Sequence, residues 1–168
     1  EHSPDCNLCP SNADALAVVT ENAYRVAKLL HQDAHNYYLW LDDTLNGACM
    51  CEKCREISAA DQNMRIVNAI ADGIRAYDSE GKAAYLAYAD SLMLPSVKPA
   101  SNVFLEFAPM DRDHNKPMQS PDEERGMRYV SLLDRLLTVF KPEETHVLEY
   151  WLDNALYSGY KKPPVKVP

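Results

Sequence analysis

The sequence has no long hydrophobic run and no cluster of basic residues. Its 168 residues include no apolar stretch approaching the roughly 18 that a membrane-spanning helix needs, so we expect no membrane span. Acidic side chains outnumber basic ones by 25 to 17, and the net charge of −8 argues against a nucleic-acid partner. A Ser/His/Asp order, a glycine-rich phosphate loop and an H-E-x-x-H zinc motif are also missing. These absences leave carboxylates, cysteines and aromatic rings as the groups that can carry chemistry.

The two ends of the sequence bear on what kind of chain this is. It begins at Glu1 rather than at methionine, and residues 163–168 are rich in proline. No signal peptide is visible, but with this start its absence says nothing about the compartment. We interpret residues 1–168 as a single α/β domain and as a fragment of a larger protein.

Helical and strand patterns alternate along the chain. Apolar residues at helical spacing predict helices over residues 11–32, 61–77 and 120–140. We expect Ser11 to cap the first of these helices and Ser120 to cap the third. Short apolar runs predict strands over residues 37–41, 83–89, 102–108 and 145–151. This order favours a parallel sheet with right-handed crossovers, and four such strands make half of a TIM-type (β/α)8 barrel.

Each expected strand is followed by at least one aspartate. In a parallel sheet these ends share one rim, where α/β enzymes place their catalytic groups. Pairs of carboxylates hydrolyse glycosidic bonds, although a single aspartate at a strand end is more often a turn or cap residue. Trp151 precedes the last such acid, in a position where its ring could stack on a sugar. The aspartates after the four strands are Asp42 and Asp43, Asp90, Asp111 and Asp113, and Asp153.

The five cysteines form two groups. Cys6 and Cys9 make one C-x-x-C pair and Cys51 and Cys54 another, with Cys49 beside the second pair. Two such pairs are typical of a tetrahedral zinc–thiolate site, which would be structural because four thiolates leave no position for a catalytic water. Disulfides with one free thiol, or free thiols alone, explain the same pattern equally well.

Several of these segments together resemble a known bacterial family. They are C-P-S-N at residues 9–12, D-D at 42–43, C-M-C-E-K-C at 49–54, the stretch ending A-P-M-D-R-D at 108–113, and the aromatic segment with Trp151 and Asp153. In this arrangement the chain resembles the family called domain of unknown function 4838, part of which is classed as glycoside hydrolase family 163. The resemblance covers nearly the whole chain, as the C-terminal half of that family's barrel.

The resemblance implies a (β/α)8 barrel with retaining endo-β-N-acetylglucosaminidase activity on complex N-glycans, in secreted, periplasmic or cell-surface proteins. It also implies that Cys9, Cys49, Cys51 and Cys54 form the cysteine cluster, with Cys6 as the spare thiol. Where the family motif carries glutamate, this chain has Asp111, whose shorter side chain holds its carboxylate one methylene further back.

Two functions follow from these patterns. The first is part of a glycoside hydrolase acting on an oligosaccharide or glycan, and the second is a non-catalytic carbohydrate-binding or structural domain stapled by the cysteine site. For the enzyme we expect Asp43 and Asp111 to be catalytic and a second set to bind substrate. That set is Asp42, Trp151, Asp153 and Asn154. An open half-barrel would expose two strand edges, so we also expect a homodimer or an unusual closure.

Overall fold

The protein is an α/β domain built on a curled, four-stranded parallel sheet. The computed structural model describes residues 7–43, 45–113 and 116–149. The strands are β1 (Asn36–Tyr37), β2 (Lys82–Ala87), β3 (Val103–Phe107) and β4 (His146–Val147), in the spatial order β1-β2-β3-β4 with every neighbouring pair parallel. This arrangement confirms the predicted half of a (β/α)8 barrel.

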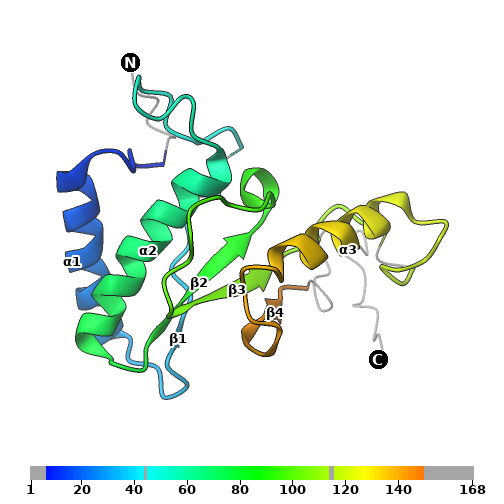
Figure 1. The fold of residues 1–168 in the computed structure, drawn as a ribbon. Coiled ribbons are helices and arrows are strands. Elements are labelled where there is room, and N and C mark those ends of the chain that lie inside the picture. The colour runs from blue at the N-terminus through cyan, green and yellow to red at the C-terminus, as the bar shows by residue number, and fades with distance from the viewer. Residues whose placement is uncertain (1–6, 44, 114–115, 150–168) are drawn as a thin grey trace, which may run out of the picture.

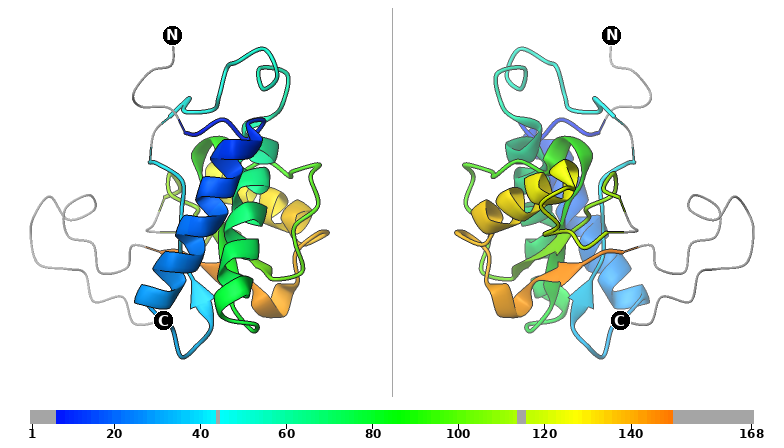
Figure 2. Two further views of the ribbon diagram at one scale, coloured as in Figure 1. Left: turned by 90° about the vertical axis from the view of Figure 1, so that its left-hand side faces the viewer. Right: turned by 90° about the vertical axis from the view of Figure 1, so that its right-hand side faces the viewer.

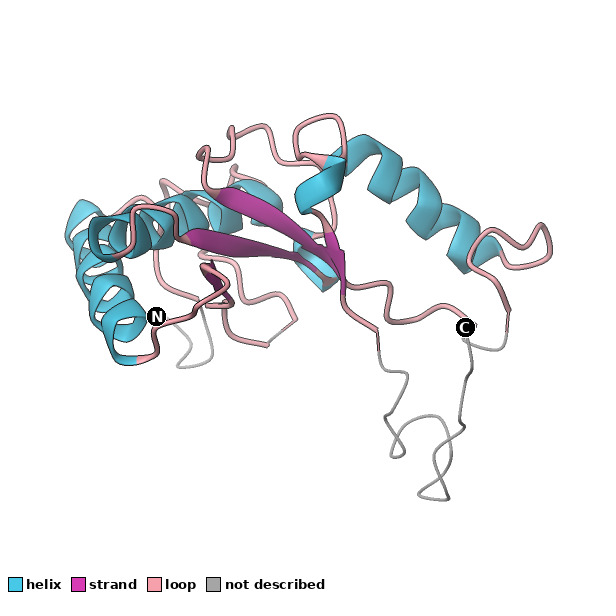
Figure 3. Ribbon diagram, turned by 90° about the horizontal axis from the view of Figure 1, so that it is seen from below, coloured by secondary structure: helices cyan, strands magenta, loops and turns pink. Residues whose placement is uncertain are grey.

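Three α-helices accompany the sheet (Figure 1). They are α1 (Ala13–Leu29), α2 (Ala59–Tyr77) and α3 (Glu124–Leu136), and two short 3-10 helices follow β2 and α3 as η1 (Ala89–Ser91) and η2 (Pro142–Glu144). Figure 2 shows α1 lying beside α2, and Figure 3 shows α3 toward the other end of the sheet. Among the described helices none has the length and apolar character to cross a bilayer.

Strand alternation gives the sheet two different faces. Residues of β2 and β3 that point outward meet α2 and α3 in the main core, where Tyr85 stacks on Phe140 and Phe107 contacts Tyr129 edge to face. Because neighbouring side chains of a strand point to opposite faces, Phe104 and Glu106 point inward, to the concave side. The inner face is where the structure puts polar and aromatic groups together.

The close packing of α1 on α2 depends on a glycine. A Cβ at Gly73 would lie 2.1 Å from the carbonyl oxygen of Thr20 and 2.9 Å from the Cβ of Ala23. Ala23 and Ala27 are both buried, so small side chains on both helices allow this approach. The apolar stripes of α1 and α2, predicted from helical spacing, therefore pack against each other as well as against the sheet.

Most elements are shorter than predicted, above all the two outer strands, whereas α2 begins two residues earlier than predicted. A strand was predicted over residues 37–41, but the chain pairs with β2 only at Asn36 and Tyr37. Beyond this point the side chains of Tyr38 and Trp40 contact Phe104 and Glu106 of β3. The predicted caps were wrong by one and three residues. Asn12 caps α1, because its side-chain oxygen accepts from the N–H groups of Asp14 and Ala15, and Glu123 caps α3 by accepting from Gly126.

Candidate functional site

Four cysteines converge above the N-terminal end of α2. The Sγ atom of Cys9 lies 3.7 Å from those of both Cys51 and Cys54, and the four Sγ atoms, with Cys49, all lie within 4.8 Å of one another. Cys49 and Cys54 are buried, and all four are free of disulfides. The structure therefore assembles the set that the family resemblance implied, and Cys6 lies outside the described residues.

This cluster fits a tetrahedral metal. Zn–S bonds of about 2.3 Å in a tetrahedron place neighbouring sulfurs about 3.8 Å apart, close to the separations between Cys9 and its two partners. Burial raises the pKa of Cys9, and it raises that of Cys49 to about 12. Desolvation also opposes ionisation of Cys51, but the Lys53 N–H and the neighbouring thiols lower its pKa to about 7. The thiolate is the form of cysteine that binds metal. The four cysteines are thus compatible with a structural metal site.

The side chain of Gln62, in the first turns of α2, holds the cysteine loop in shape. Its Nε2 donates to the carbonyl oxygens of Cys49, Cys54 and Ile57, at 3.2, 3.0 and 3.1 Å, and its Oε1 accepts from the Cys49 N–H at 2.8 Å. Gln62 is only 4% exposed. It is a functional residue that sequence reasoning missed, because nothing in its neighbourhood along the chain marks it.

A cavity of about 280 Å³ opens at the carboxyl end of the sheet. It lies between the segment that follows β1 and the strand β2, because Trp40 and Asp43 line one side and Ala84 and Leu86 the other. Asp42, Asp43 and Asp90 all line it, so the structure brings together the acids that follow the first two strands. Asn63, buried in α2, also lines it, and its Oδ1 has no hydrogen-bond partner.

Short-range contacts shape the mouth of this cavity. The Asp42 N–H donates to Asn7 Oδ1 at 3.0 Å, and Asp90 Oδ2 accepts from the Asn46 N–H at 2.6 Å. Ala89 has a positive φ of 46°, a backbone angle that residues other than glycine seldom adopt. The bend at this residue directs the chain from β2 into Asp90. Asp42 and Asp43 are exposed and available to a ligand.

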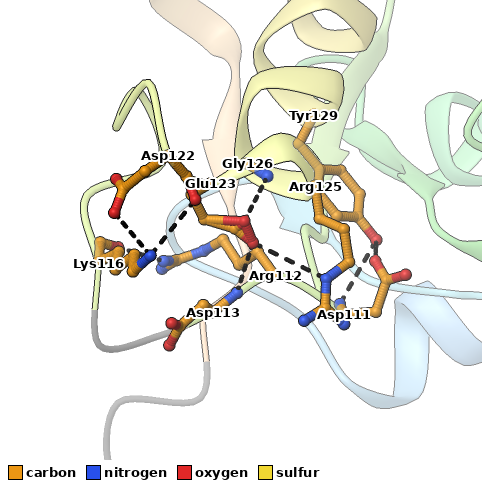
Figure 4. A network of polar contacts seen from close by, with 9 residues as sticks. All are labelled: Asp111, Arg112, Asp113, Lys116, Asp122, Glu123, Arg125, Gly126 and Tyr129. Atoms are coloured by element: carbon orange, nitrogen blue, oxygen red, sulfur yellow. Dashed lines mark hydrogen bonds and ion pairs between the residues drawn. The ribbon is translucent and has the colours of Figure 1, made fainter.

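Asp111, the other predicted catalytic acid, does not line this cavity. The Tyr129 hydroxyl of α3 donates to its carboxylate, and burial, followed by this hydrogen bond, raises the pKa of Tyr129 to about 12. Figure 4 shows the surrounding loop held by polar contacts, with Glu123 at its centre. Glu123 accepts from the N–H of Asp113 at 3.1 Å and from that of Gly126 at 3.4 Å.

A largely buried ion pair joins the ends of β3 and β4. Arg112 Nη2 lies 2.6 Å from Glu149 Oε1, and the two side chains are only 10% and 13% exposed. Such a pair requires good geometry because both charges lose water. Trp151, Asp153 and Asn154, predicted to bind substrate, follow directly but lie outside the described residues.

One acid of the inner face was not predicted. Glu106 sits in the middle of β3, is 6% exposed, and accepts a hydrogen bond of 3.0 Å from the Trp40 indole nitrogen. The available signal was a single charged residue inside an otherwise apolar strand, N-V-F-L-E-F-A. The predicted catalytic acids all follow the strands, whereas Glu106 lies within one.

Comparison with known families finds a match that covers most of the chain. The family model described as Domain of unknown function (DUF4838) matches residues 1–152. The chain belongs to the DUF4838 family. No curated protein and no solved structure matches it. The cysteine loop, the sheet rim and Glu106 of this DUF4838 member all lie within the matched residues.

Proposed function

We propose that this DUF4838 chain is part of a glycoside hydrolase that cleaves O-glycosidic bonds in an oligosaccharide. One observation carries the proposal: a cavity at the carboxyl end of the sheet, lined by the half-exposed Trp40 and by the carboxylates of Asp42 and Asp43. Indole rings offer sugars an apolar face, and carboxylates supply the acid and base of glycoside hydrolysis.

The roles follow from this arrangement. Asp43 would stabilise or attack the anomeric carbon, while Asp42 and the ring of Trp40 would bind the sugar. Asp111 stays the predicted partner acid, with Trp151, Asp153 and Asn154 as predicted contacts to substrate. The finer assignment, an endo-β-N-acetylglucosaminidase acting on complex N-glycans in a secreted, periplasmic or cell-surface protein, comes from the family resemblance.

The test is hydrolysis of a glycoprotein that bears complex N-glycans, with released oligosaccharide measured by mass spectrometry. We expect Asp43→Asn to lower turnover by about 10³-fold or more, because the anomeric carbon loses its carboxylate. Asp134→Asn, on the exposed side of α3, is the matched control and should leave turnover unchanged. Unchanged turnover in Asp43→Asn would remove Asp43 from the site, and glycan binding without turnover would favour the non-catalytic carbohydrate-binding domain.

We further propose that the four-cysteine site binds a structural zinc. Cys9, Cys49, Cys51 and Cys54 supply four soft anionic ligands, the usual set for structural zinc. Four thiolates leave no open position, so the metal would stabilise the cysteine loop and take no part in hydrolysis.

The partner we propose besides the glycan is a second copy of the chain. Among the described residues β1 and β4 each pair on one side only, and unpaired strand edges favour association. Light scattering during size-exclusion chromatography should give twice the 19.0 kDa chain mass. A monomer across the accessible concentration range would contradict this dimer.

A further inference from the structure

The inner face of the sheet holds a buried carboxyl group whose position needs explaining. Glu106 is 6% exposed, and its neighbours across the sheet, Leu86 and His146, are in register with it and share its face. Burying a carboxylate without a compensating charge costs several kcal/mol, so an acid is seldom kept in such a place for packing alone. Among the described residues no Lys or Arg forms an ion pair with Glu106.

The groups around Glu106 are aromatic. Trp40 donates its indole N–H to Oε2 at 3.0 Å, which orients the carboxyl group. Tyr38, Phe104 and His146 form a ring cluster on the same face, with Tyr38 and Phe104 centroids 5.5 Å apart and a 3.0 Å contact between the Tyr38 hydroxyl and His146 Nδ1. Glu106 is thus surrounded mainly by aromatic rings, and in the described part of the chain its hydrogen-bond donor is Trp40.

Such a setting favours the protonated acid. Burial raises the pKa of Glu106 above its usual value, and the Trp40 hydrogen bond opposes this only in part. A carboxyl group held in an apolar pocket against a tryptophan is the known way to keep a glycosidase acid protonated. Asp42 and Asp43, by contrast, are exposed to solvent.

Trp40 connects this acid to the cavity. Its indole nitrogen bonds Glu106, and the same side chain, 46% exposed, lines the cavity beside Asp43. A sugar bound in this cavity beside Trp40 would therefore share the cavity with the exposed Asp43 carboxylate, and Trp40 would connect it to the buried acid. Neither acid lines the cavity itself: Asp111 bonds Tyr129, whereas Glu106 adjoins the cavity through its hydrogen bond with Trp40.

We propose that Glu106, rather than Asp111, is the proton donor of the glycosidase reaction and that Trp40 positions it; this inference rests on the proposed function. As the C1–O bond breaks, its electron pair goes to the leaving oxygen, which takes the proton of the Glu106 carboxyl group. Asp43 stabilises or captures the anomeric carbon. Water then adds to that carbon and gives a proton to Glu106; where Asp43 has bonded to the carbon, the C1–O bond to Asp43 breaks in this step and its electron pair returns to the Asp43 carboxylate, so the hydrolysis balances.

The first test separates proton donation from every other role. Glu106→Gln keeps the size of the side chain but has no acid proton, so kcat/KM on the N-glycoprotein should fall by about 10²–10⁴-fold. An aryl glycoside with a dinitrophenolate leaving group needs no proton, so its hydrolysis should stay within about tenfold of the unchanged protein. Glu143→Gln, at an exposed position, is the matched control.

A second measurement does not require a Glu106 variant to fold. In a Trp151→Phe background, Trp40 is the remaining tryptophan, so its fluorescence should titrate with an apparent pKa above that of an ordinary glutamate. The basic limb of the kcat/KM profile of the unchanged protein should fall at the same pH. Trp40→Phe, which removes the donor but keeps an aromatic ring, should move that limb to higher pH.

The outcomes distinguish this inference from the proposed function. If the full-length protein that contains this chain hydrolyses neither substrate, the glycosidase proposal fails and the donor role fails with it. If it is active and Glu106→Gln keeps its turnover on the glycoprotein, only the donor role is overturned. Equal loss on both substrates, or a basic limb that does not coincide with the Trp40 titration, would also overturn it.

Discussion

The side-chain amide of Gln62 hydrogen-bonds both backbone polar groups of Cys49. Its Oε1 accepts from the Cys49 N–H at 2.8 Å and its Nε2 donates to the Cys49 carbonyl at 3.2 Å. An amide can match a peptide group in this way because it carries one acceptor and two donors. Helix α2 thereby fixes the cysteine loop at the point where the first of its three thiols enters the cluster.

Replacing Gln62 by Met should destabilise the protein by about 1–3 kcal/mol, because the buried Cys49 N–H loses its partner while the volume is kept. Urea denaturation of the zinc-loaded protein measures the change in the free energy of unfolding. Gln119→Met, at an exposed position, should have little effect. Equal midpoints for the two variants would show that the Gln62 hydrogen bonds contribute nothing to stability.

Metal analysis should find about one zinc per chain, as a four-thiolate site requires. Cys51→Ser should lose the metal, because a hydroxyl does not replace a thiolate ligand, and its melting temperature should fall. Cys6→Ser should keep both zinc and melting temperature, because the cluster is complete without Cys6. Two disulfides and no metal in the purified chain would contradict the zinc site.

Gly73→Ala should destabilise the protein by about 1–3 kcal/mol through overpacking, because the added methyl would press on the backbone of α1 at Thr20. Thermal unfolding followed by circular dichroism checks this. Ala76→Ser lies on the exposed side of the same helix and serves as the control. A Gly73→Ala protein as stable as the unchanged chain would mean that α1 and α2 can separate at little cost.

The pair His35 and Asp78 should make stability depend on pH. Nδ1 of His35 lies 2.8 Å from Asp78 Oδ2, and this hydrogen bond raises the pKa of His35, with burial opposing. Burial alone would raise the pKa of Asp78, but the hydrogen bonds from His35 and Tyr37 outweigh burial and lower this pKa. His35 makes its full contribution to the free energy of unfolding at pH values below about 6.5, the pKa of an unfolded histidine. Asp78 makes its full contribution above about 3.9, the pKa of an unfolded aspartate.

Stability should therefore fall as the pH rises above about 6.5 through the raised pKa of folded His35. It should fall again in acid, as the pH passes through the lowered pKa of Asp78. In His35→Gln the decline on the alkaline side should flatten, whereas His31→Gln should keep it. Urea midpoints between about pH 2 and pH 9 measure both declines, and parallel curves for the unchanged protein and His35→Gln would contradict the prediction.

Local sequence patterns were enough to predict the layers of this fold. The apolar runs that became β2 and β3, and the stripe of α2 that includes Met64 and Ile74, depend on burial, which periodicity records well. The first strand was predicted, but its short pairing was not, because pairing depends on where the neighbouring strand lies. Leu39 and Leu41 do pack against the core, but the intervening Trp40 turns to Glu106 on β3.

The candidate site divides in the same way. Cys49, Cys51 and Cys54 meet because a tight loop joins them, so their spacing in the sequence predicted a cluster. The choice of Cys9 as the fourth member rested on the family resemblance. Glu106 and Gln62 act through contacts with residues brought close by the fold, at Trp40 and Cys49. No spacing along the chain encodes such contacts, although a lone acid in an apolar strand was a signal available at Glu106.

The contact between Cys9 and Cys54 spans 45 positions of the chain and encloses both α1 and β1. If these thiolates share a metal, tension applied at the N-terminus would pass from Cys9 across the cluster to α2, leaving the enclosed helix and strand unloaded. Under force the chain would first extend only up to Cys9, and the enclosed length would be released in one step when the cluster ruptures. The cluster would then serve as a mechanical clamp whose strength depends on metal supply.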